Sequence, residues 1–109
     1  MNYKVDTTDT FKREAKRLIK KYPSLKNELA ELGNSLSLNP KTGIHLGNDI
    51  YKIRLAVKSK GKGTRSGTRI MTKVKIINET VYLFSIYSKG EKNNISDKEI
   101  KNLIKEIPK

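Results

Sequence analysis

Four cationic side chains occupy alternating positions on two neighbouring stretches of this sequence that resemble β-strands. Lys52 and Arg54 share one side of the first stretch, and Arg69 and Lys73 share one side of the second. Paired strands bring such side chains within reach of one another, where like charges repel unless an anion lies between them. Because the guanidinium fork of arginine matches a phosphate, we expect this face to bind a nucleic-acid backbone. The alternative is a solvated face in which lysine serves only solubility.

The same side chains have the chemistry that RNA cleavage requires. RNA carries its own nucleophile, the 2′-hydroxyl, so an enzyme must supply a proton acceptor, a stabiliser of phosphate charge and a proton donor. Crowded lysines have lowered pKa values and can act as base or acid, while arginines stabilise the charge. Tyr87 is a further candidate for a general acid, a general base or a platform on which a base stacks. Strict alternation along the strand places Tyr87 on the same face as Leu83. The other face then carries Tyr82, Phe84 and Ile86, which we expect to be buried.

No metal or cofactor is predicted. The acidic residues are scattered without the spacing of metal ligands, and the chain contains no cysteine. His45 is the single histidine and lies between Ile44 and Leu46. We expect it to be structural rather than catalytic.

A basic, glycine-rich segment, KSKGKGTRSG, separates the two cationic strands. It runs from Lys58 to Gly67 and contains four cations, Lys58, Lys60, Lys62 and Arg65, with three glycines and no apolar side chain. Because it lies between two well-defined strands, we expect a long hairpin loop at the rim of the site. Its glycines would let the backbone approach phosphates closely while the cations bind them. The alternative is a disordered, solubilising loop.

The elements that position these residues follow from hydrophobic periodicity. An alternating start predicts a short strand, and apolar residues three and four apart predict two helices joined as a hairpin, the first capped by Asp9 or Thr10. Alternation then predicts the strands IYKIRLAVK, TRIMTKVKIIN and ETVYLFSIYSK, and a capping box at Ser96 and Glu99 begins a last helix. We predict an α+β fold, with the helices on one face of a mostly antiparallel sheet and residues 1–109 forming one domain.

The net charge of +13 constrains the partners of this chain. Nucleic acid is the first polyanion that could relieve such a charge, and an acidic protein is the second. A lysine-rich composition without such a partner is the alternative. No membrane partner is predicted, because no apolar run could span a bilayer and the N-terminus lacks the apolar core of a secretory signal. We therefore expect a cytoplasmic protein.

Taken together, the helical hairpin followed by YKIRLAV, GTRIMTKV and VYLFSIYSK resembles the RelE/ParE toxin superfamily, in particular its RelE- and HigB-like branch. The resemblance covers nearly the whole chain. It implies the RelE-like fold and a bacterial type II toxin that enters the ribosomal A site and cuts mRNA without a metal. The 2′-hydroxyl route would leave a 2′,3′-cyclic phosphate and a 5′-hydroxyl.

The resemblance also implies roles for individual residues. Lys52 and Arg54 match the two cations of the family's first site strand, and Arg69 matches its phosphate-stabilising arginine. Lys89 matches a cation at the end of the last strand that helps to stabilise the transition state. The sequence departs from the family at Ile95, near a position where RelE-type enzymes often carry a tyrosine, so either Tyr87 substitutes or catalysis rests on the lysines.

Three other functions remain compatible with this sequence. They are a ParE-like inhibitor of DNA gyrase, a non-catalytic RNA-binding domain and an inactive toxin of the same fold. Every toxin interpretation implies a cognate antitoxin, small and acidic in the segment that covers the basic surface. The cleaving toxin would also bind mRNA and ribosomal RNA.

Overall fold

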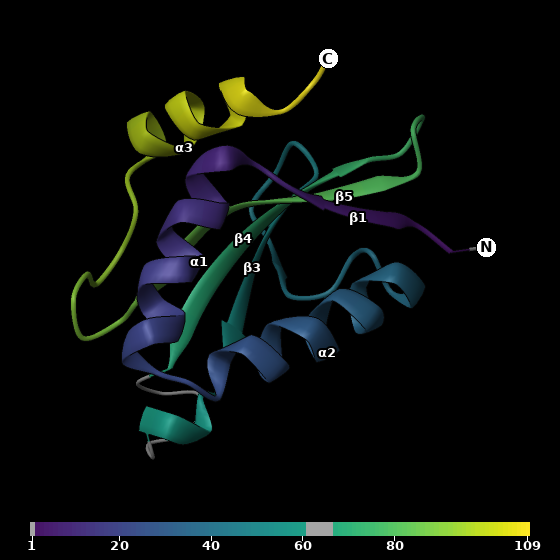
Figure 1. The fold of residues 1–109 in the computed structure, drawn as a ribbon. Helices are drawn as coiled ribbons and strands as arrows, with labels where there is room; N and C mark the ends of the chain where they lie inside the picture. Colours follow the sequence, from purple (N-terminus) through teal and green to yellow (C-terminus); the bar gives the residue numbers. More distant parts are fainter. Residues whose placement is uncertain (1, 61–66) are drawn as a thin grey trace.

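The computed structural model describes residues 2–60 and 67–109, and Figure 1 shows their arrangement. The elements, in chain order, are β1 (Lys4–Thr7), α1 (Asp9–Lys21), α2 (Leu25–Leu38), β2 (Ile44–His45), β3 (Ile50–Leu55), the 3-10 turn η1 (Lys58–Lys60), β4 (Thr68–Lys75), β5 (Thr80–Ser88), α3 (Asp97–Leu103) and the 3-10 turn η3 (Ile104–Glu106). The predicted order of strand, helical hairpin, strands and last helix is confirmed.

One five-stranded sheet forms the centre of the molecule, in the order β1-β5-β4-β3-β2. β1 pairs in parallel with β5, and the other neighbours are antiparallel. The long central strands β4 and β5 are hairpin partners, so the register of one follows from the other. The predicted α+β class with a mostly antiparallel sheet is confirmed.

The helical hairpin covers one face of the sheet. α1 is capped by Thr8, whose Oγ1 accepts a hydrogen bond of 3.2 Å from the backbone N–H of Phe11, so the helix begins slightly earlier than predicted. Its apolar stripe buries Phe11, Ala15 and Leu18, and these side chains join sheet residues such as Ile70 and Ile86 in the larger core cluster. In the described parts of the chain, no helix is long and apolar enough to cross a membrane.

The C-terminal helix covers the opposite face, so the expectation that every helix packs on one face is wrong. Ile100, Leu103 and Ile104 pack against a second core cluster that includes Met71 and Phe84. The physical reason lies in β5, where all nine residues are buried and both faces therefore require a cover. The predicted capping box of α3 is present: Ser96 and Glu99 bond to each other's backbone N–H groups.

A β-bulge in the β4–β5 pair changes which side chains of β5 share a face. Met71 pairs with Ser85 and Thr72 pairs with Leu83, which leaves Phe84 as the extra residue. Beyond the bulge the alternation is reversed. Tyr87 therefore joins Tyr82 and Phe84 in the cluster beneath α3, while Leu83 and Ile86 face the helical hairpin. The prediction that Tyr87 and Leu83 lie on the same face of the sheet is wrong, because it assumed unbroken alternation along β5.

Candidate active site on the cationic sheet face

Strand register brings three of the predicted site residues together. Arg54 and Arg69 are direct partners across β3 and β4, and Lys52 pairs with Met71, two residues along the same strands. Side chains two apart on a strand share a face, so all three cations lie on the face that α3 partly covers. Arg69 also pairs with Tyr87 of β5, which places Tyr87 at the same end of the sheet.

Lys89 completes a group of four positive charges, which we call the cation cluster: Lys52, Arg54, Arg69 and Lys89. Lys89 follows the end of β5, and its backbone N–H donates a hydrogen bond of 3.2 Å to the carbonyl of Gly67, just before β4. Burial lowers the pKa of the Lys52 ammonium, and the positive charges of Arg54, Arg69 and Lys89 lower it further. Lys52 is thus close enough to each of the other three cations for their charges to affect its protonation.

The members of the cation cluster differ in their exposure. Arg54 and Lys89 are exposed and Lys52 is half-buried, whereas Arg69 lies at the floor of the site and is only 4% exposed. A positive floor beneath exposed cations suits an anion that arrives from solvent. The lowered pKa of Lys52 also increases the fraction of neutral amine at a given pH, and a neutral amine can accept a proton.

Tyr87 lies beside the cluster, but its hydroxyl is enclosed. Burial raises the pKa of Tyr87, opposed by the nearby charges of Arg69 and Lys92 and reinforced by Glu99. The Oη atom is buried, and no hydrogen-bond partner for it is found in residues 2–60 and 67–109. The phenol therefore stays protonated near neutral pH, and its ring packs beneath α3.

Lys73 is separated from the cation cluster along β4. It lies four residues beyond Arg69, about 13 Å at the usual rise of a strand. Its Nζ donates a hydrogen bond to the backbone carbonyl of Asn48, in the turn between β2 and β3. The structure thus ties Lys73 to this turn rather than grouping it with Lys52.

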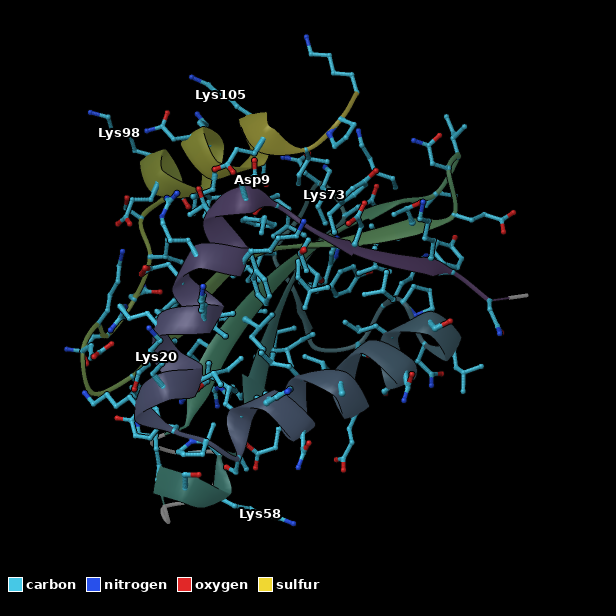
Figure 2. All side chains as sticks on the ribbon, in the orientation of Figure 1. Asp9, Lys20, Lys58, Lys73, Lys98 and Lys105 are labelled. Carbon is cyan, nitrogen blue, oxygen red and sulfur yellow. The ribbon has the colours of Figure 1, made fainter. Side chains whose placement is uncertain are left out.

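The two described cations of the basic loop lie by the helical hairpin. The backbone N–H of Lys58 donates to Glu28 Oε2 at 2.8 Å, and Figure 2 shows the side chain of Lys58 extending away from the rest of the molecule. Lys60 Nζ donates to Ser88 Oγ at 2.8 Å and stands 5.3 Å from the ring centre of Tyr22. Lys62 and Arg65 lie outside the described residues, so their predicted role as RNA contacts stays a prediction.

His45 lies on the edge strand β2, away from the cation cluster. Its ring stacks on Tyr51 at a centroid distance of 4.9 Å, and the two residues are direct partners across β2 and β3. Tyr51 belongs to the core cluster under the helical hairpin, so both rings lie on the opposite face from Lys52. This placement agrees with a structural role for His45.

A groove that sequence reasoning did not find leads up to Lys52. It has a volume of about 580 Å³ and runs between α3 and β3, with Ile50, Met71, Ile95 and Ile100 among its apolar walls and Asn48 and Asn94 among its polar ones. It could not be predicted while α3 was assigned to the other face. In the described part of the chain there is no group of three or more His, Cys, Asp and Glu residues that could hold a metal ion.

The sequence of this chain matches a known protein family. A family model described as the RelE toxin of the RelE / RelB toxin-antitoxin system matches residues 3–109. The chain belongs to the RelE toxin family. It is therefore, by family, a toxin of a toxin-antitoxin system, as the resemblance of its sequence implied.

The fold of this RelE family member is similar to that of a solved RelE structure. A mutant of the E. coli toxin RelE in the free state is similar with a TM-score of 0.65 and 17% identity, over 99% of this chain and 100% of that chain. A chain of the intact E. coli RelBE toxin-antitoxin complex is 22% identical over 77% of this chain and 93% of its own, with a TM-score of 0.49. The similarity to free RelE confirms the predicted RelE-like fold.

Proposed function

We propose that this RelE family toxin cuts mRNA on the ribosome by the 2′-hydroxyl route, without a metal ion. The observation that carries the proposal is the cation cluster, in which Lys52 has a lowered pKa beside Arg54, Arg69 and Lys89. A lysine with a shifted pKa beside arginines, on a face that an anion can reach, is typical of a site for phosphate chemistry. Membership of the RelE toxin family supports a ribosome-bound message as the substrate.

The proposed reaction uses the cluster as follows. The neutral amine of Lys52 takes the proton of the 2′-hydroxyl, whose oxygen attacks the adjacent phosphorus while the bond from phosphorus to the 5′-oxygen breaks. Arg69 from below and Arg54 from the side stabilise the additional charge on the phosphate oxygens. Arginines keep their protons, so the ammonium of Lys89 is the acid that protonates the departing 5′-oxygen. The products are a 2′,3′-cyclic phosphate and a 5′-hydroxyl.

Tyr87 has no proton-transfer role in this proposal, because its hydroxyl is buried and its pKa is raised. Its ring instead supports the floor of the site beside Arg69. We also propose that a cognate antitoxin, acidic in its binding segment, neutralises the toxin in the cytoplasm. The excess of positive charge supports such a partner.

The experiment that tests the proposal maps the 5′ ends of a defined mRNA in a cell-free translation reaction. The protein is treated with chelator before addition, and the variants are Arg69→Ala, Tyr87→Phe and Lys98→Ala. Lys98 is an exposed lysine on α3, and its replacement changes the net charge by the same amount as that of Arg69. A reaction without ribosomes completes the set.

We expect cuts within codons for the wild type, for Tyr87→Phe and for Lys98→Ala, and none for Arg69→Ala or without ribosomes. An intact message with wild-type protein contradicts the proposal, and inhibition of DNA gyrase becomes the next assay. Cuts that persist in Arg69→Ala also contradict it, since they would show that the cluster is not the site. If only Tyr87→Phe loses activity, the hydroxyl of Tyr87 takes part in the proton transfer.

A further inference from the structure

The segment that follows β5 is attached to α1 through one carboxylate. The two oxygens of Glu91 accept hydrogen bonds from the guanidinium of Arg17, at 2.9 and 3.2 Å, and one of them also accepts from Lys21 Nζ at 3.1 Å. Figure 1 shows this segment running beside α1. We call the three side chains, Glu91, Arg17 and Lys21, the α1 clamp.

The α1 clamp is ionised at any pH near neutrality. Hydrogen bonds from Arg17 and then from Lys21 lower the pKa of Glu91 to about 2. The same bonds raise the pKa values of Arg17 and Lys21. The two-pronged geometry of Arg17 also fixes the direction of the carboxylate, which a single lysine contact would not do.

Glu91 stands two residues after Lys89, in one tight turn. The backbone N–H groups of Glu91 and Lys92 both donate 3.0 Å hydrogen bonds to the carbonyl of Ser88, and Ser88 itself is fully buried. The N–H of Lys89 donates to Gly67. Because this turn connects Glu91 to Lys89, the contact of Glu91 with α1 also restricts the movement of Lys89.

Lys89 requires such a force because its neighbours repel it. Lys52, Arg54 and Arg69 carry the same charge as Lys89, and Lys89 itself is exposed just after the end of β5. In the described residues, the backbone bond to Gly67 and the α1 clamp hold this segment, together with the hydrogen bond from Lys60 to Ser88 and the ion pair between Lys92 and Glu99. The clamp supplies an attraction that offsets the repulsion.

We propose that Glu91, held by Arg17 and Lys21, is a positioning residue for RNA cleavage that keeps the turn carrying Lys89 against the cation cluster. The inference rests on the proposed function, since Lys89 acts there as the acid. Glu91 does not touch the RNA in this proposal. Its loss should therefore reduce the rate of the bound complex more than the affinity.

The test compares Glu91→Gln with Glu106→Gln. Glu106 is a matched control, because it also bonds α1 from another element, through the backbone N–H of Thr10 at 3.0 Å, and its replacement changes the net charge equally. Cleavage rates are measured over a range of programmed-ribosome concentrations. We expect Glu91→Gln to lower kcat about tenfold or more with KM within about twofold, as for a displaced catalytic group, and Glu106→Gln to change neither.

A second measurement needs no RNA and so separates this inference from the proposed function. Amide hydrogen exchange of residues 89–92 should become faster in Glu91→Gln and stay unchanged in Glu106→Gln. In cleavage, Arg17→Gln should add little to Glu91→Gln, because both act through the same contact.

The inference is overturned if exchange in residues 89–92 is unchanged, if Glu91→Gln and Glu106→Gln lose activity alike, or if the loss lies entirely in KM. If wild-type protein does not cut RNA but exchange responds as expected, the proposed function fails and the holding role of Glu91 stands.

Discussion

Arg54 and Arg69 face each other across β3 and β4, with Lys52 two residues away on the same face. Like charges placed directly opposite one another destabilise a sheet. The pKa of Lys52 is lowered because the folded protein disfavours the charged form of this side chain. Burial is the larger cause, and repulsion by the neighbouring cations is the second. A site that is unfavourable when empty and relieved by a phosphate is the arrangement expected of a functional surface.

We expect Lys52→Met to stabilise the free protein while it abolishes RNA cleavage. Methionine retains most of the apolar stem and removes the charge, so the gain should be about 0.2–1 kcal/mol in the free energy of unfolding. The folded-state pKa of Lys52 lies below its ordinary value of 10.5, so the destabilisation is present at neutral pH and disappears as pH rises through that folded-state pKa.

Urea unfolding at several pH values measures this gain, with Lys98→Met as the control at an exposed position. The control should change stability by less than the Lys52 variant at pH 7. A Lys52→Met protein that is less stable than wild type at pH 7 would show that the lysine has a stabilising partner, which contradicts the argument from repulsion.

At the scale of elements, regular periodicity was predictable from the sequence and its interruption was not. The strands of Lys52 and Arg69 follow from alternation, and their pairing follows from the hairpin, so this part of the site could be predicted. The bulge at Phe84 has no local signature in VYLFSIY, because every residue there suits a buried strand. The side of the sheet that α3 covers depends on long-range packing, which a seven-residue amphipathic helix does not specify.

The capping box of α3 offers a test at this scale. We expect Ser96→Ala to weaken α3 by about 1 kcal/mol, because the serine hydroxyl satisfies the backbone N–H of Glu99 at the start of a short helix. Amide hydrogen exchange should accelerate in residues 97–103 and much less in α1. Asn93→Ala, an exposed change in the same connecting segment, is the control. Equal acceleration in α1 and α3 would mean that α3 opens only with the whole molecule, contrary to this expectation.

At the scale of the whole molecule, the net charge of +13 predicted a polyanionic partner but not where the charges gather. Lys58 and Lys60 were expected at the rim of the site because they are adjacent in sequence to its strands. Their segment also bonds to the turn of the helical hairpin, where Ser59 and Ser24 exchange hydrogen bonds of 2.8 and 2.9 Å, while Lys60 reaches Ser88, next to Lys89 of the cation cluster. The two serine contacts join residues 35 positions apart, so local pattern could not reveal them.

The basic loop can still contribute to binding as part of the wider positive surface. We expect the quadruple variant of Lys58, Lys60, Lys62 and Arg65 to glutamine to bind ribosomes more weakly. The slope of log affinity against log salt should fall by about 0.7–0.9 for each phosphate contact that is lost.

The control replaces four exposed lysines elsewhere, Lys41, Lys98, Lys105 and Lys109, and so matches the change in net charge. Filter binding at several salt concentrations measures both. Equal effects in the two variants would show that only the total charge matters, which contradicts a specific role for the loop. A larger change in slope for the loop variant would establish direct phosphate contacts, because counterions are released only where a cation meets the RNA backbone.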